Sequence, residues 1–374
     1  MKYLFILGRN PELAITELTA YFQSHNNSLL SYSTNKNSIL AEFSKPIEKN
    51  AISHLGGTIS IGEVLAKNKN INEVIKQLDK TTITQQTENK FNYVFLNFTD
   101  EEADKIKSCL KSRFKEEKYK AIEKNPSGIL KLESGKIVEN IPSNSNIQEQ
   151  YFLFKDIEYN FGRIIEIYNS KEQEKRDMSK PVRREELAIP PRLAKIMINL
   201  SQIKENQTLL DPFCGIGVIL QEALIQGINV IGIDKDPEAI KGAKNNIEWL
   251  NIKKENYKLI NDYSTKVKIT PVNSLVTEPD LGQILREIPT QQQAKQILNN
   301  FEDLIIKVLN NLKHNVKGKI VFTSPLIKIK ENRYERSSVN IEKITKTVNL
   351  KLINKFTDSR EDQIVARNIF VLEK

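Results

Sequence analysis

Regular alternation of short apolar runs with helical segments dominates the carboxyl half of the chain. Runs such as TLLDPF, NVIGID, YKLIN, NSLVTE and KIVFTSP are separated by stretches whose apolar residues recur at helical spacing. Apolar runs of this length without polar alternation are typical of strands buried on both faces of a parallel sheet. We therefore predict that residues 192–374 form an α/β domain whose doubly wound parallel sheet is covered by helices.

A smaller α/β pattern begins the chain. KYLFILG predicts a strand that ends at Gly8, and Asn10-Pro11 supplies a helix N-cap followed by a first-turn proline. SILAEF and GGTISIGEVL predict further strands. We assign residues 1–65 to one small α/β domain.

Residues 66–168 show a weaker pattern. INEVIKQL and EEADKIKSCLKSRFKEEKY predict helices, NYVFLNF predicts a strand, and QYFLFKD and YNFGRIIEIYN predict a hairpin. The polar segment ESGKIVENIPSNSN predicts a loop. We assign 169–191 to a linker, in which residues 171–184 hold six basic and three acidic side chains. That composition is typical of a linker or of an exposed track for phosphates.

Composition narrows the class of protein. The chain has 374 residues and carries 56 basic against 47 acidic side chains, a net charge of +9 that favours polyanions or reflects a solvated lysine-rich surface. Cys109 and Cys214 lack CxxC spacing and the histidines lie in unrelated segments, so we expect no disulfide framework and no metal. No apolar run approaches membrane-spanning length. We expect a cytoplasmic protein without a membrane segment.

The strongest local signal is LLDPFCGIGVIL, in which Gly215 and Gly217 lie on a turn between a strand and a helix. Glycines at such a turn let the backbone approach a ligand, and the helix presents free amide groups to it. The next strand ends in Asp234, 17 positions after Gly217, where related folds place the acid that binds ribose hydroxyls. Together these residues predict a nucleoside-binding site.

Two residues distinguish among nucleoside cofactors. Leu220 stands where a dinucleotide-binding motif needs its third glycine, which disfavours NAD. Asp211 precedes the turn, and its carboxylate would repel a pyrophosphate but suits the ammonium of an amino acid. The combination selects S-adenosylmethionine as the cofactor.

These motifs resemble a known family. DPFCGIG resembles the first motif of nucleic-acid amino-methyltransferases, usually DPFCGSGT, with Ile216 and Val218 in place of its hydroxyl residues. Four further segments resemble the THUMP-containing tRNA guanosine N2-methyltransferases. They are KYLFILGRNPELAITEL, LGGTISIGEVL, the segment from FGRIIEIYN to IPPRLAKIMINLS, and EDQIVARNIFVLEK. The resemblance implies a Rossmann-like class I methyltransferase domain with a seven-stranded sheet. It also implies a ferredoxin-like domain at 1–65 and a THUMP-like RNA-binding domain at 66–168.

The resemblance also implies roles for single residues. The methionine part of the cofactor would be lined by the turn residues Asp211, Pro212, Phe213, Cys214, Gly215 and Gly217. Asp234 would hold the ribose, and Asp262 would accept a hydrogen bond from the adenine amino group. Asp262 as an ordinary turn residue remains an alternative.

The fourth motif departs from the family pattern T-D-P-P-Y-G, since residues 277–282 read TEPDLG. An exocyclic guanine amine is a poor nucleophile, so its site must orient the amine and accept its protons. Glu278 keeps an acid there, and Asp280 is a second candidate catalytic residue. Leu281 replaces the aromatic residue that stacks on the base, a contact worth about 1–3 kcal/mol.

We therefore predict a methyltransferase that uses S-adenosylmethionine and acts on the N2 amine of a tRNA guanosine, at position ten if it follows the family. A methyltransferase-fold RNA-binding protein without turnover, and an amino-methyltransferase of another nucleic acid, remain alternatives. We expect a monomer or weak homodimer. The candidate phosphate contacts are Lys105, Lys107, Lys111, Arg113, Lys115, Lys118, Arg176, Lys180, Arg183 and Arg184.

Overall fold

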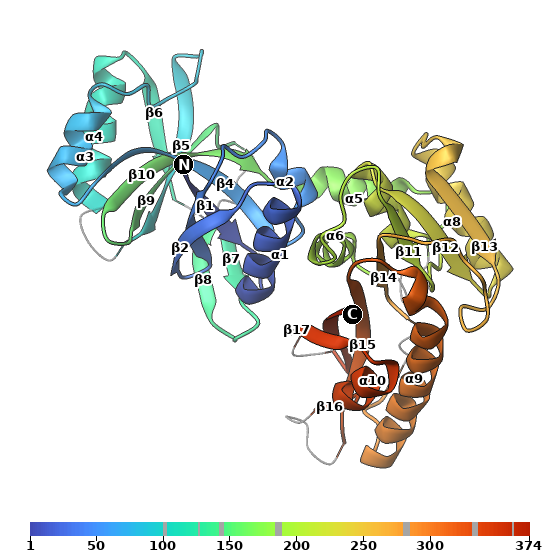
Figure 1. Cartoon of the computed structure of the whole chain (residues 1–374). Coiled ribbons are helices and arrows are strands. Elements are labelled where there is room, and N and C mark those ends of the chain that lie inside the picture. The colour runs from blue at the N-terminus through green and yellow to red at the C-terminus, as the bar shows by residue number, and fades with distance from the viewer. Residues whose placement is uncertain are drawn as a thin grey trace. The chain divides into compact units, whose positions relative to one another are not determined.

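The computed structural model forms two compact units (Figure 1). It describes residues 1–99, 103–125, 128–141, 146–183, 189–279, 285–330, 336–360 and 363–374. The first unit comprises Met1–Ala14, Asn27–Ser53 and Gly57–Tyr168, and the second comprises Ile15–Asn26, His54–Gly56 and Asn169–Lys374. The domain boundaries drawn from the sequence stay predictions.

One eight-stranded sheet with the order β2-β3-β1-β4-β10-β9-β5-β6 organises the first unit. Its strands are β1 (Lys2–Leu7), β2 (Leu29–Asn35), β3 (Ser38–Phe43), β4 (Thr58–Asn68), β5 (Lys90–Phe98), β6 (Lys120–Lys124), β9 (Glu149–Lys155) and β10 (Tyr159–Ile167). The accompanying helices are α2 (Ala51–His54), α3 (Ile71–Leu78) and α4 (Ala103–Glu116), whereas α1 (Pro11–Ser24) belongs to the second unit from Ile15 onward. The predicted hairpin is confirmed, because β9 and β10 pair antiparallel.

The segment predicted as a polar loop contains a strand, so that prediction is wrong. β7 (Gly128–Lys131) and β8 (Ile137–Ile141) form a small antiparallel sheet. Gly135 takes the left-handed conformation at φ +83° in the connecting turn, which glycine adopts without steric cost. Leu132 and Val138 are buried beside it. Two inward apolar side chains are enough for this hairpin, and the polar residues around them hid the signal.

The second unit contains the predicted doubly wound α/β sheet, with strands in the order β13-β12-β11-β14-β15-β18-β17 and β16 paired to β15. The strands are β11 (Thr208–Asp211), β12 (Asn229–Asp234), β13 (Tyr257–Asn261), β14 (Ser274–Thr277), β15 (Ile320–Lys328), β16 (Arg336–Ser338), β17 (Lys351–Asp358) and β18 (Val365–Glu373). The helices are α5 (Ser170–Ser179), α6 (Pro191–Leu200), α7 (Val218–Ile225), α8 (Pro237–Trp249), α9 (Gln291–Leu312) and α10 (Ile341–Val348). The class I methyltransferase arrangement of seven strands is confirmed.

The sheet is not entirely parallel, which corrects the pattern-based prediction. β18 pairs antiparallel with both β15 and β17. Only six residues separate β17 from β18, and a parallel crossover needs a dozen or more. The short connection therefore forces the last strand to run against its neighbours.

A buried core fixes the positions of the strand ends in the second unit. α9 begins with a capping box between Thr290 and Gln293 and places Leu298, Phe301 and Ile305 against the sheet. Full burial of each such side chain stabilises the fold by about 1.5–3 kcal/mol. The strands are thereby held rigidly, and their carboxyl ends can present side chains in fixed geometry. Within the described ranges, no helix is long and apolar enough to cross a bilayer.

Candidate active site

Acidic residues stand at the carboxyl ends of four adjacent parallel strands in the second unit. Asp211 ends β11, Asp234 ends β12, Asp262 follows β13 and Glu278 follows β14. The parallel register of these strands brings their carboxyl ends to one edge of the sheet. Open α/β sheets bind their ligands at this edge. The structure thus brings together four acids that lie far apart in the sequence.

Asp211 is enclosed at the centre of this edge, with 1% of its surface exposed. Its Oδ1 accepts hydrogen bonds from Thr277 Oγ1 at 2.6 Å and from Phe213 N at 3.1 Å. Burial raises the pKa of Asp211 to about 7, and the nearby charges of Asp234 and Glu278 contribute while the two hydrogen bonds oppose the shift. This carboxyl group titrates near neutral pH, so a cationic ligand would favour its ionised form.

The glycine turn has the open geometry that its sequence predicts. Gly215 and Gly217 adopt left-handed φ values of +51° and +85°, a region that other residues enter only with strain. Gly217 is the N-cap of α7, and a Cβ atom on Gly215 would meet nothing within 4 Å. The backbone of the turn is therefore accessible, next to the amide groups that begin α7.

Asp234 connects this turn to the next strand. Its Oδ2 accepts from Gly215 N at 2.9 Å, and its Oδ1 accepts from Asp236 N at 2.9 Å. Asp262 lies beside it, because the Asp262 amide donates to the Asp234 carbonyl at 3.2 Å. The Asp262 carboxylate accepts from its neighbour Tyr263 N at 2.7 Å and lies 3.9 Å from Lys266 Nζ. Both carboxylates are partly exposed at the sheet edge.

Three other residues of the predicted cofactor motif shape the turn from inside. The Pro212 carbonyl accepts a hydrogen bond from Ser264 Oγ, and Phe213 packs against the core of the unit. The Cys214 amide donates to the Ile233 carbonyl at 3.0 Å, and burial raises the pKa of the Cys214 thiol. The Cys214 sulfur lies 3.1 Å from where a Cβ on Gly232 would stand. Cys214 thus packs onto β12.

Glu278 is bound to an arginine that the sequence did not suggest. Arg367 on β18 donates from Nε to Glu278 Oε1 at 2.6 Å and from Nη2 to Oε2 at 3.4 Å. Thr323 on β15 donates to the same Oε1 at 3.3 Å. Burial would lower the pKa of Arg367, but the charge and hydrogen bonds of Glu278 raise it. Three neighbouring strands therefore hold this carboxylate.

The structure adds Thr277, Thr323 and Arg367 to the site. Thr323 and Arg367 are isolated in the sequence, and only the order of the strands brings them to Glu278. Thr277 precedes Glu278 directly, but its bond to Asp211 follows from the pairing of β11 with β14. An inward-facing arginine in the apolar run of β18 was the one available signal for Arg367. The predicted catalytic residue Asp280 and its neighbour Leu281 lie outside the described residues.

Several candidate phosphate contacts form ion pairs within the protein. Lys107 and Lys111 both pair with Glu123, at 3.0 and 3.1 Å, and Arg113 pairs with Glu117 at 2.6 Å. Arg113 also pairs with Asp79 at 3.7 Å, and further pairs join Arg176 to Glu222 and Lys180 to Asp177. These cations already have acidic partners, which reduces the charge they offer to a nucleic acid. Arg184 lies outside the described residues.

Family models match most of the chain. The model described as "DNA methylase" matches residues 9–245, and the "RMKL-like, methyltransferase domain" matches residues 181–345. The first match covers more than half of the 374 residues.

Across the described parts of the chain, no group of histidine, cysteine or acidic residues is arranged to hold a metal ion.

Curated relatives and a solved structure agree with these matches. The tRNA (guanine(10)-N2)-dimethyltransferase of Methanocaldococcus jannaschii is 32% identical over 36% of this chain, and the aligned part spans 37% of that relative's length. The probable tRNA (guanine(10)-N2)-dimethyltransferase of Methanothermococcus thermolithotrophicus is 33% identical over 31% of this chain and 74% of that relative. TrmN from Thermus thermophilus has the same fold, with a TM-score of 0.54 and 12% identity over the whole of both chains. The chain therefore belongs to the family described by the DNA methylase model and to the family of the tRNA (guanine(10)-N2)-dimethyltransferases.

Proposed function

We propose that this protein transfers a methyl group from S-adenosylmethionine to the N2 amine of a guanosine in tRNA, at position 10, the position in the names of its relatives. The observation that carries the proposal is the set of acids around the glycine turn, at the ends of four adjacent strands. We propose that the amino-terminal regions at 1–65 and 66–168 contact the RNA. We also propose that the protein acts in the cytoplasm.

The residues present fit the proposed cofactor. Gly215 leaves open space for close approach of a ligand to the backbone. The buried carboxyl of Asp211 suits an ammonium group, since a cation would offset the cost of ionising it there. Asp234 and Asp262 are partly exposed at the carboxyl ends of the next two strands, and they are the residues that would hold a ribose and an adenine. When bound, the cofactor supplies an electrophilic methyl group.

Glu278 is proposed to orient the target amine. Its Oε1 already accepts hydrogen bonds from Arg367 and Thr323, whereas Oε2 accepts one long bond from Arg367. A carboxylate oxygen has two lone pairs, so among the described contacts Oε2 retains room for an N–H donor. An amine hydrogen bonded there is held in one orientation, and such positioning contributes strongly to the rate of a reaction with a weak nucleophile. Asp280 stays a candidate for accepting the proton.

Transfer of label from S-adenosylmethionine to an unmodified tRNA transcript tests the proposal. We expect N2-methylguanosine or N2,N2-dimethylguanosine by nucleoside mass spectrometry, and no product from a transcript with adenosine at position 10. Absence of transfer to any tRNA at low salt and excess enzyme contradicts the catalytic proposal.

A parallel assay with duplex DNA addresses the second candidate substrate, which the DNA methylase match favours. If the protein methylates DNA but not tRNA, the proposed cofactor stands and the proposed substrate is wrong. Tight binding of tRNA without cofactor binding would instead support an RNA-binding protein on a methyltransferase scaffold.

A further inference from the structure

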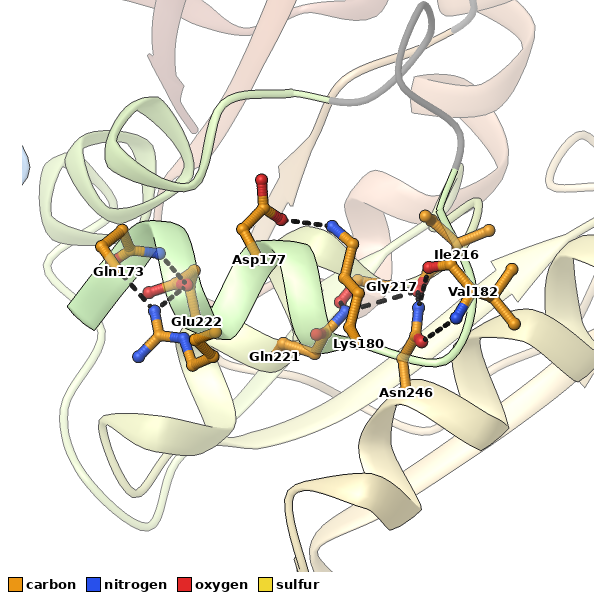
Figure 2. Close-up of polar contacts among 10 residues, drawn as sticks. Gln173, Asp177, Lys180, Val182, Ile216, Gly217, Gln221, Glu222 and Asn246 are labelled. Carbon is orange, nitrogen blue, oxygen red and sulfur yellow. Dashed lines mark hydrogen bonds and ion pairs between the residues drawn. The ribbon is translucent and has the colours of Figure 1, made fainter. Parts of the chain in front are cut away.

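The basic segment that precedes the methyltransferase core contacts the glycine turn through one buried side chain. Asn246, on α8, is fully buried. Its Oδ1 accepts from Val182 N at 2.9 Å, and its Nδ2 donates to the carbonyls of Val182 and Ile216, each at 3.0 Å. Figure 2 shows the amide group of Asn246 pointing toward Val182 and Ile216, which lie next to each other. One amide group therefore joins residues 180–183 to the turn that contains Gly215 and Gly217.

Close packing supports the same connection. A Cβ atom on Gly242 would lie 3.1 Å from Val182 Cγ1 and 3.2 Å from Ile216 Cγ2. The Val182 and Ile216 side chains thus pack together over the bare backbone of α8, one turn from Asn246. Gln221 completes the arrangement, because its Nε2 donates to the Gly217 carbonyl at 2.9 Å. The carbonyl groups of the turn are held by side-chain amides from two different helices.

The other end of the segment is anchored to the helix that the turn begins. Arg176 on α5 pairs with Glu222 on α7, and Gln173 donates to the same Glu222 oxygen at 3.4 Å. Glu222 is 3% exposed, and a buried carboxylate that loses its cation is destabilised. Figure 2 shows Gln173 and Glu222 at one side, and Val182 and Asn246 at the other. Residues 173–182 are thus fixed to the turn through Val182 and Asn246, and to the middle of α7 through Glu222.

We propose that Asn246 is a positioning residue that makes residues 180–183 part of the cofactor site. It holds the Ile216 carbonyl, and with it the turn whose backbone faces the cofactor, against the backbone of Val182. This inference rests on the proposed function, since the turn is taken to bind S-adenosylmethionine. Cofactor binding that orders the turn then also orders residues 180–183. A nucleic acid that displaces these residues weakens cofactor binding, and the cofactor weakens binding of that nucleic acid by the same factor.

Two variants approach the contact from opposite sides. Asn246→Leu keeps a similar volume and removes all three hydrogen bonds, whereas Val182→Pro removes only the amide that donates to Asn246. Val182→Ala keeps that amide and isolates the loss of the valine packing. Asn229→Leu is a first control, since Asn229 bonds the Asn206 carbonyl at 3.2 Å at the amino end of β12. Asn315→Leu is a second control, since Asn315 also bonds a backbone carbonyl, that of Ile269, at 3.0 Å but lies near the amino end of β14.

Calorimetric titration with S-adenosylmethionine measures the effect on the site. We expect Asn246→Leu and Val182→Pro to weaken binding about tenfold, the value of one well-made hydrogen bond, and the double variant to be no weaker than either alone. Both controls should change the affinity less than about twofold. Wild-type affinity in Asn246→Leu, or equal losses in Asn315→Leu at a matched unfolding temperature, would overturn the proposal.

Hydrogen exchange of the cofactor-free protein separates this inference from the proposed function. Asn246→Leu and Val182→Pro should each speed exchange at residues 180–183 and at 214–218 together, and the controls should not. Faster exchange confined to one of the two segments contradicts the coupling. If the wild-type protein binds no S-adenosylmethionine, the proposed function fails and the exchange result still decides whether Asn246 links the segments.

Discussion

Two acids on adjacent strands of the same sheet edge have opposite surroundings. Asp211 and Glu278 each accept a hydrogen bond from a threonine, Thr277 and Thr323 respectively. Glu278 is also paired with Arg367, whereas among the residues that the structure describes no lysine or arginine pairs with Asp211. The pKa of Asp211 rises to about 7 as a result of its burial. The difference supports the proposal that Asp211 pairs with a cationic group of the cofactor, whereas Glu278 is already held in place by a cation of the protein.

Replacing Glu278 by glutamine tests the substrate side of this comparison and has the largest expected effect. Glu278→Gln keeps the shape but removes the charge, and we expect methyl transfer to fall by about 10²–10⁴-fold, the usual contribution of a positioned acid or base. The dissociation constant for S-adenosylmethionine should stay within about threefold. Single-turnover kinetics measure the rate, with the exposed Glu248→Gln as control. If the Glu278→Gln enzyme stays active, a group other than Glu278 orients the target amine.

Removing the arginine should destabilise the second unit. Arg367→Gln leaves Glu278 buried without its cation, which costs about 3–5 kcal/mol. Trp249, the single tryptophan of the chain, lies in this unit on α8 and reports its unfolding in urea. The double variant Glu278→Gln/Arg367→Gln should recover most of the loss, since neither charge then remains unpaired. Additive losses would show that the two side chains act separately.

Asp211→Asn should stabilise the protein near neutral pH and remove cofactor binding. The pKa of Asp211 is about 7 in the folded chain and near 3.9 when unfolded. Folded Asp211 therefore retains a proton that the unfolded chain releases, so its contribution to stability falls as pH rises from about 4 to 7 and is constant above that. We expect the variant to gain up to about 4 kcal/mol at pH 8 and nothing below pH 4. Urea titrations at several pH values measure this gain, and a gain independent of pH contradicts it.

Thr277→Val has the smallest expected effect and sharpens the same point. Losing the hydrogen bond to Asp211 should cost about 1 kcal/mol. Because that bond opposes the rise in the pKa of Asp211, the pH at which cofactor binding reaches half its maximum should move upward. Thr323→Val is the matched control, as its hydroxyl bonds Glu278 instead. If cofactor binding depends on pH in the same way in both variants, Asp211 is not the group that sets this pH dependence.

Local sequence was sufficient to group the residues around the glycine turn. A short apolar strand, two glycines with positive φ and an acid at the next strand end are adjacent features, so Asp211, Gly215 and Asp234 could be predicted together. Arg367 could not, because it lies 89 positions from Glu278 and reaches it only through the reversed strand β18. Glu222 reads as an ordinary helical acid, and only burial reveals it as the anchor of α5.

The position of β18 has a consequence for synthesis of the chain. This strand lies between β15 and β17 in the sheet, although it follows both in the sequence. Chains fold as they emerge from the ribosome, amino-terminal parts first, and a nascent chain without residues 365–373 has open strand edges on both sides of the gap. The Glu278 carboxylate lacks its ion pair until Arg367 is translated, 89 residues later. The Glu278 carboxylate therefore gains its ion pair only after β18 has been translated, and a product truncated before residue 365 lacks both the strand and this ion pair.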